Sequence, residues 1–238
     1  MAQDDFEVLR TGNEYFKAFV NANHRDAVWV VQAQSQTPPF LIIGCADSRV
    51  AEGTVFGALP GTLFAQRNIA NQFLPDDTNV QSALQYAVDY LGVSHVLVLG
   101  HYNCGGCLAA MSPRPEADDS PLQDWIDPIR RLYEGAQTEE ITHFKTALAA
   151  QHAPFDIVNG LKDDDNANDA LKTLIELNVR VTVESVLQSK TIQDHYAKLP
   201  PFPTATAAAA AAASDNNNSK NLKASESADP QPEPEPKP

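Results

Sequence analysis

Three side chains that bind soft metals lie in two short motifs. Cys45 opens the segment Cys45-Ala-Asp-Ser-Arg49, and His101 and Cys104 lie three residues apart in His101-Tyr-Asn-Cys-Gly105. Two thiolates and one imidazole form a ligand set that suits zinc. Three protein ligands leave the fourth position to water or to a weaker oxygen ligand. That is the pattern of a catalytic zinc site rather than of a closed structural one.

A carboxylate and a guanidinium follow the first cysteine closely. Asp47 lies two residues after Cys45, where a carboxylate could bind the metal, accept a proton from metal-bound water or pair with an arginine. Arg49 carries a planar pair of donors that can hold Asp47 in a bidentate ion pair. Such a pair lowers the pKa of the carboxyl group and keeps the carboxylate off the metal, which leaves the fourth position to water.

Both motifs follow directly on short apolar runs. Residues 40–45 and 94–100 are typical of parallel strands buried on both faces, and residues 62–67 are a weaker strand candidate. Helical periodicity alternates with these strands, in residues 13–20, 80–91, 126–133 and 167–177. This alternation predicts an α/β fold, with a central, mostly parallel β-sheet flanked by helices. Because sites in open parallel sheets form beyond the carboxyl ends of the strands, Cys45 and His101 should emerge at the same edge.

Plainer explanations exist for the same residues. A single cysteine at a strand end is most often a small buried hydrophobe, and Cys104-Gly-Gly-Cys107 could be a redox dithiol. The dithiol leaves Cys45 and His101 unexplained, whereas a metal site uses both and leaves Cys107 as a buried neighbour. Three is also an odd and small number of cysteines for a disulfide framework, which favours a reducing compartment.

The composition argues against several functional classes. The 238-residue chain has 17 Lys and Arg against 31 Asp and Glu, which gives a net charge of −14. Such a surface repels phosphate backbones, so we expect no nucleic-acid partner. No apolar run reaches the roughly 18 residues of a membrane span, so we expect no membrane partner. The acidic start lacks the basic region of a signal peptide, which favours a cytoplasmic protein.

The composition changes near residue 200. Residues 201–238 contain seven consecutive alanines at 207–213, an asparagine run and a proline-rich end, with few large apolar residues. Such a segment cannot bury enough surface to offset its ordering entropy. We therefore predict a catalytic domain over residues 1–200 and a disordered low-complexity tail over residues 201–238.

The two motifs, with their flanks, resemble those of the β-class carbonic anhydrases. The flanking likeness covers Gln36, nine residues before Cys45, and residues 67–71 and 82–88. The resemblance implies a β-carbonic-anhydrase-like fold with one zinc per subunit, held by Cys45, His101 and Cys104. It also implies that Asp47 and Arg49 form the catalytic dyad and that four residues line the substrate pocket: Gln36, Phe64, Tyr86 and Gly105. In that family the pocket lies at a dimer interface, which implies a homodimer or a higher assembly of dimers.

By the same resemblance, the chain hydrates carbon dioxide reversibly to bicarbonate and a proton, with zinc-bound hydroxide as the nucleophile. Two alternatives stay open: a carbonyl sulfide or carbon disulfide hydrolase with the same site, and an inactive zinc-binding scaffold. One difference from the family pattern favours the scaffold alternative. In the family, the segment that corresponds to residues 178–189 is followed by a further strand that opens with His-Gly. Residues 191–200 do not match that pattern, so the usual last strand should be missing.

Overall fold

The computed structural model describes residues 5–115, 118–150 and 165–199. By its internal contacts the chain divides into two units, residues 1–196 and residues 197–238. The sheet and both motifs lie in the first unit. The tail that we predict to be disordered, residues 201–238, lies outside the described residues.

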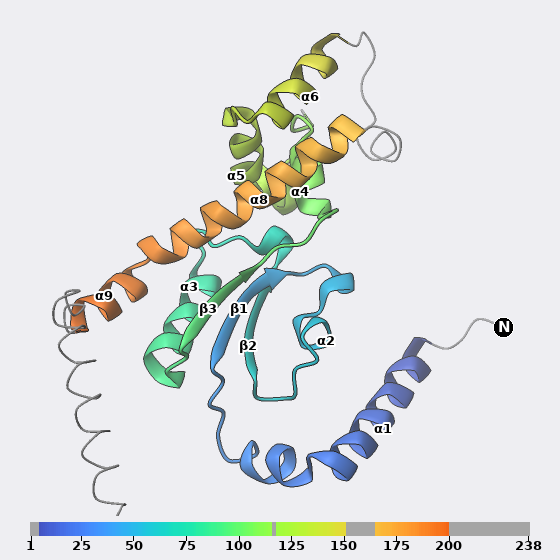
Figure 1. Cartoon of the computed structure of the whole chain (residues 1–238), viewed down its shortest axis with the longest axis vertical. Coiled ribbons are helices and arrows are strands. Elements are labelled where there is room, and N and C mark those ends of the chain that lie inside the picture. The colour runs from blue at the N-terminus through green and yellow to red at the C-terminus, as the bar shows by residue number, and fades with distance from the viewer. Residues whose placement is uncertain (1–4, 116–117, 151–164, 200–238) are drawn as a thin grey trace, which may run out of the picture. The chain divides into compact units, whose positions relative to one another are not determined.

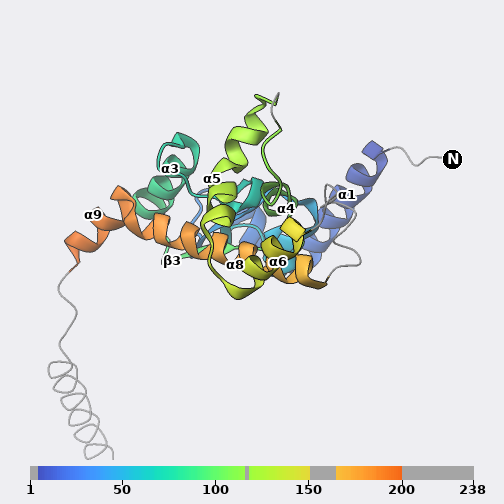
Figure 2. The ribbon, with the colours of Figure 1, turned by 90° about the horizontal axis from the view of Figure 1, so that it is seen from above.

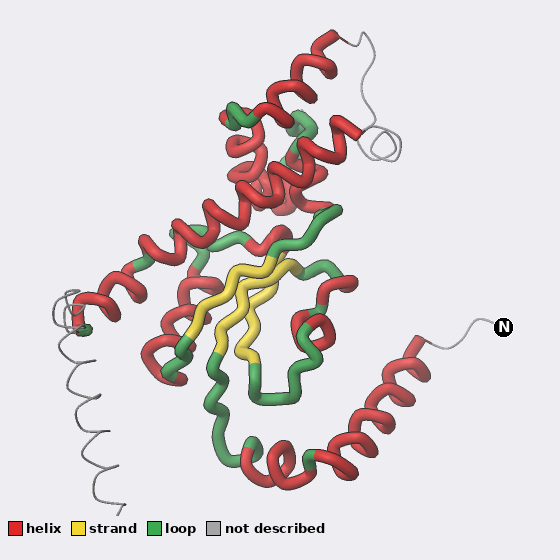
Figure 3. The backbone as a smooth tube through the Cα atoms, in the orientation of Figure 1, coloured by secondary structure: helices red, strands yellow, loops and turns green. Residues whose placement is uncertain are grey.

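Three parallel strands form the sheet (Figure 3). They are β1 (Phe40–Cys45), β2 (Leu63–Asn68) and β3 (His95–Leu99), in the order β2-β1-β3. In the register, Cys45 pairs with Asn68, and Gly44 pairs with Leu99. All three strands therefore end at one edge of the sheet, and the predicted α/β class is confirmed.

The prediction that β3 is buried on both faces is wrong. Its five residues are exposed or half-buried, and Leu97 is 41% exposed. Two features account for this exposure. Leu97 lines an apolar hollow on one face of the sheet, and among the described residues no strand pairs with the side of β3 opposite β1. The sheet has three strands within the described part of the chain, and the loss of the usual last strand stays a prediction.

Helices surround this sheet (Figures 1 and 2). Those before β3 are α1 (Asp5–Asn23), α2 (Glu52–Val55) and α3 (Thr78–Gln85). Those after β3 are α4 (Gly105–Ala110), α5 (Pro121–Gly135), α6 (Glu139–Ala150), α8 (Asp165–Gln188) and α9 (Lys190–Lys198). π-Helical turns at Asp26–Val31 and Tyr86–Leu91 extend α1 and α3. None of the described helices combines the length and the apolar character needed to cross a membrane.

Alternation along β1 directs its side chains to two different environments. Leu41 and Ile43 are fully buried against Val80 and Leu84 of α3. Ile42 points to the opposite face, where an apolar hollow of about 430 Å³ lies between the strands and the segment around α2. A second apolar cluster joins α4, α5, α6 and α8, and it includes both Cys45 and Cys104. The motif residues are thus anchored in the larger core.

Candidate metal centre

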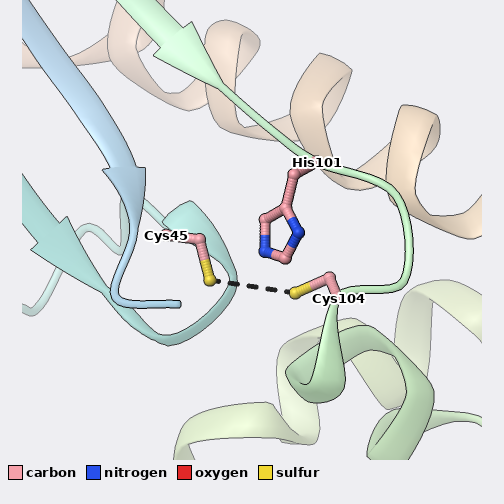
Figure 4. A group of neighbouring side chains, drawn as sticks. All are labelled: Cys45, His101 and Cys104. Carbon is pink, nitrogen blue, oxygen red and sulfur yellow. Dashed lines mark hydrogen bonds between the residues drawn. The ribbon is translucent and has the colours of Figure 1, made fainter. Parts of the chain in front are cut away.

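The structure brings Cys45, His101 and Cys104 together at the carboxyl edge of the sheet (Figure 4). Cys45 is the last residue of β1, His101 follows β3, and Cys104 directly precedes α4. One ligand atom from each residue lies within 4.8 Å of the others, and the two sulfur atoms are 3.9 Å apart. Both cysteines are buried, so the backbone rather than solvent determines where their sulfur atoms lie.

The histidine ring is oriented as a metal ligand. Its Nδ1 atom donates a hydrogen bond to the carbonyl oxygen of Tyr102 at 2.9 Å. Because a carbonyl only accepts, Nδ1 carries the proton and Nε2 keeps a free lone pair. Nε2 is buried without a hydrogen-bond partner, and the ring lies beside the two neighbouring thiols. An orphaned imidazole nitrogen beside two buried thiols fits a zinc ion, whose ligands are nitrogen and sulfur.

Without a metal ion, both thiols hold their protons firmly. The neighbouring Cys104 thiol, followed by burial, raises the pKa of Cys45 above its usual range. The Cys107 thiol, with burial as a further cause, raises the pKa of Cys104 to about 11. A divalent cation reverses this balance because a coordinated thiol is deprotonated. The site is therefore arranged to bind a cation at the expense of protons.

Asp47 and Arg49 form the predicted bidentate pair. The Arg49 Nε atom donates to Asp47 Oδ1 at 2.9 Å and Nη2 donates to Oδ2 at 2.6 Å. Arg49 Nη2 also donates to the carbonyl oxygen of Asn103 at 3.0 Å. The Arg49 side chain holds the pKa of Asp47 well below its usual range. The carboxylate is charged, and its Oδ2 lies 3.8 Å from His101 Nε2.

A buried turn after β2 supports the first cysteine. The backbone N–H of Ala70 donates to Cys45 Sγ at 3.4 Å. Ala70 and Asn71 have φ angles of 61° and 46°, a left-handed conformation that costs about 1–3 kcal/mol for each non-glycine residue. Neighbouring side chains hold this conformation: Trp125 donates to the carbonyl oxygen of Ile69, and Asn178 donates to that of Ala70, both at 2.8 Å.

Arg67 fixes the loop that carries Asp47. It donates to the carbonyl oxygen of Cys45 at 3.0 and 2.9 Å and to that of Asp47 at 2.8 Å. In the sequence, residues 67–71 stand out only as a flank of the motifs, and nothing marks Trp125 or Asn178 as part of the site. No local signal could have identified these two, because 56 and 108 residues separate them from their partners.

The four predicted pocket residues divide into two groups. Gly105 begins α4 next to Cys104, at the metal centre. Phe64 and Tyr86 contact each other with ring centroids 5.8 Å apart, but Phe64 pairs with Leu41, four residues before the end of β1. At about 3.3 Å per residue, Phe64 lies roughly 13 Å back along the strand from the ligand edge.

Gln36 is exposed in the segment before β1. Of the four predicted pocket residues, therefore, only Gly105 directly follows a metal-ligand candidate, Cys104, in the same chain. The pocket role of the other three residues stays a prediction.

Comparison with known proteins assigns this arrangement to a family. The family model described as carbonic anhydrase matches residues 40–199. A carbonic anhydrase of Emericella nidulans is 34% identical over 164 residues, which cover 69% of this chain and 61% of that protein. This chain thus spans less than two thirds of the fungal relative's length.

Solved structures agree with the sequence relatives. The β-carbonic anhydrase of Coccomyxa, solved in complex with acetazolamide, superposes with a TM-score of 0.66 at 31% identity, covering 83% of this chain and 78% of that one. A tetrameric β-carbonic anhydrase of Sordaria macrospora superposes with a TM-score of 0.64 at 26% identity, covering 82% and 87%.

Proposed function

Because the chain belongs to the β-class carbonic anhydrases, we propose that it catalyses the reversible hydration of carbon dioxide to bicarbonate and a proton. The observation that carries this proposal is the cluster of Cys45, His101 and Cys104, with the ion pair of Asp47 and Arg49 beside it. A purely structural metal would not need the ion pair of Asp47 and Arg49. A closed structural site would also need a fourth strong ligand, and the cluster supplies three.

In this proposal, each residue has a defined task. Cys45, His101 and Cys104 hold one zinc ion per subunit, which supplies the Lewis acidity that makes water a nucleophile at neutral pH. Asp47 accepts a hydrogen bond from the attacking water and orients it. Its low pKa means that it passes a proton on to solvent rather than keeping it. Arg49 keeps Asp47 charged and directed at this position.

The backbone of α4 contributes to product binding. Gly105 is the first residue of that helix, and the first N–H groups of a helix have no acceptor within the helix itself. Such a donor, together with the amide group of Gln36, would orient the oxygen atoms of bicarbonate.

We further propose a homodimer or an assembly of dimers. Helix α1 buries only Val20 within its own chain and exposes several large apolar residues, among them Phe6, Leu9 and Tyr15. The apolar hollow beside Ile42 is a second exposed apolar surface, on the sheet. A second subunit would cover both surfaces and bring its own Phe64, Tyr86 and Gln36 to the ligand edge. The tetrameric relative from Sordaria macrospora supports assembly.

Stopped-flow measurement of carbon dioxide hydration tests the proposed activity. The zinc-loaded full chain is compared with Cys45→Ser, which removes a ligand, and with Cys107→Ser, which changes a buried cysteine outside the cluster. We expect zinc-dependent hydration by the wild type and by Cys107→Ser, and a rate at the uncatalysed background for Cys45→Ser.

A wild-type rate equal to that of Cys45→Ser would overturn the proposal. The same three proteins are assayed with carbonyl sulfide and carbon disulfide. Turnover of these substrates without carbon dioxide hydration would identify a hydrolase, whereas zinc binding with no turnover would identify a scaffold.

A further inference from the structure

The turn at Ala70 and Asn71 contacts Cys45 on one side and the start of α4, which follows Cys104, on the other. Its Ala70 N–H reaches Cys45 Sγ, at the end of β1. On its other side lies α4, which begins directly after Cys104: a Cβ atom at Gly106 would lie 2.7 Å from Ile69 Cγ2 and 3.1 Å from Ala70 Cβ. The turn therefore touches the backbone elements that carry both cysteines.

This turn is strained, and its conformation depends on distant side chains. Ala70 and Asn71 are both in the left-handed region, which L-residues other than glycine rarely adopt. Strain of this kind persists only where the surroundings determine the conformation, and it is most common at functional sites. Here the strained peptide is the one that presents a hydrogen-bond donor to a metal ligand.

Asn178 is the residue of α8 that holds the turn. Its side chain is buried, with 4% exposure, and Nδ2 donates to the carbonyl oxygen of Ala70 at 2.8 Å. Ala70 is itself completely buried, so no water can replace this donor without rearrangement. Fixing the carbonyl oxygen of Ala70 fixes the backbone orientation on both sides of that residue, including the direction of its N–H group.

We propose that Asn178 is a positioning residue for the metal centre: it anchors the strained turn so that the Ala70 N–H stays directed at the Cys45 sulfur. A hydrogen bond to a thiolate withdraws electron density from the sulfur, so it reduces the charge that Cys45 donates to the metal. Partners behind the direct ligands tune metal sites in this way. The proposal deepens the proposed function and rests on it only in taking the cluster to be a metal site.

The test compares two isosteric changes on one face of α8. Asn178→Leu removes the donor, and Thr182→Val removes a second buried polar group one turn further along the helix. Each variant is loaded with Co²⁺, and zinc affinity is measured by competition with a chelator. We expect Asn178→Leu to shift the sulfur-to-cobalt charge-transfer band to longer wavelength and to weaken zinc binding by about tenfold or more. Thr182→Val should match the wild type in both.

A rescue variant separates positioning from general damage. Glycine adopts the left-handed region without strain, so Ala70→Gly in the Asn178→Leu background should return the band and the zinc affinity toward the wild type. An Asn178→Leu protein that melts at a lower temperature but keeps the wild-type band and affinity would overturn the proposal. So would a double variant that shows no recovery.

A measurement on the unmodified chain covers the case in which Asn178→Leu does not fold. In the ¹¹³Cd-loaded protein, the Ala70 amide proton should show scalar coupling to cadmium through Cys45 Sγ. An Ala70 amide without this coupling would overturn the proposal. None of these readouts uses carbon dioxide, so a failure of the proposed activity would leave them intact, and their failure would leave the activity untouched.

Discussion

Replacing Gly106 with alanine should destabilise the protein through a defined overlap. The added Cβ atom would lie 2.7 Å from Ile69 Cγ2 and 3.1 Å from Ala70 Cβ. Carbon atoms pack at about 3.5–4.0 Å, so the nearer pair must separate by roughly 1 Å. Neither neighbour yields easily, because Ile69 Cγ2 lies on a stiff β-branched side chain and Ala70 Cβ is fixed to the strained turn.

The size of the effect follows from two opposing contributions. Overpacking typically costs about 1–3 kcal/mol, while glycine to alanine within a helix gains about 1 kcal/mol. Because neither neighbour yields easily, we take the upper half of the overpacking range, about 2–3 kcal/mol. The net loss is then about 1–2 kcal/mol, which lowers the melting temperature by about 2–8 °C for a domain of this size. The assay is thermal unfolding followed by circular dichroism. Protein concentrations must be equal, because assembly shifts the apparent stability.

Two variants make this reasoning refutable. Gly105→Ala adds the same group one residue earlier, where nothing lies within 4 Å of the new Cβ atom, so it should not destabilise the protein. Ile69→Ala removes the overlapping methyl group, so the Gly106→Ala and Ile69→Ala double variant should lose less than the two single variants together. A Gly106→Ala protein as stable as the wild type, or strictly additive losses, would refute the overlap.

Three further outcomes follow from the metal centre. Zinc binding to the metal-free chain at pH 8 should release about two protons, because the pKa values of Cys45 and Cys104 are both raised and zinc binds thiolates. An indicator dye in weak buffer measures the proton release. Zinc binding without any proton release would contradict the prediction. Zinc at about 100 times its Kd should add roughly 2.7 kcal/mol of stability, and a melting temperature unchanged by chelation would argue against a metal site. Arg49→Gln should return the pKa of Asp47 toward its usual range. A pH titration of the ¹³C resonance of the Asp47 carboxyl carbon measures this pKa. Because the folded pKa of Asp47 is lowered, its contribution to stability is present above about pH 3.9 and is lost as the pH falls toward the folded value. The difference in stability between the wild type and Arg49→Gln should therefore disappear in acid.

The ligands were predictable because their signal is local. Cys45 and His101 each follow a short apolar run, and the geometry of parallel strands brings such ends together whatever the distance in sequence. The exposure of β3 was not predictable from its own residues, since an apolar run does not reveal whether a neighbouring strand exists. The pairing of Asp47 with Arg49 could be predicted because two residues separate them.

Helix α8 shows how tertiary packing overrides local preference. The predicted helix covers residues 167–177, but α8 runs from Asp165 to Gln188. The added stretch holds Val179, Val181 and Val183, whose β-branched side chains disfavour helix. Asn178, Thr182 and Val186, spaced four residues apart, are nevertheless buried on one face. That burial extends the helix and places Asn178 where it meets the turn at Ala70.

The side of β3 that pairs with no strand of the described residues also affects how molecules of this chain meet one another. The strand reads His95-Val-Leu-Val-Leu99 and has none of the lysine or proline residues with which proteins protect a sheet edge. The net charge of −14 makes copies of the chain repel one another. At 0.1 M salt this repulsion acts over a screening length of about 10 Å. At 1 M salt the screening length falls to about 3 Å, and this repulsion no longer protects the edge. Raising the salt concentration should therefore favour association of copies of this chain through the β3 edge.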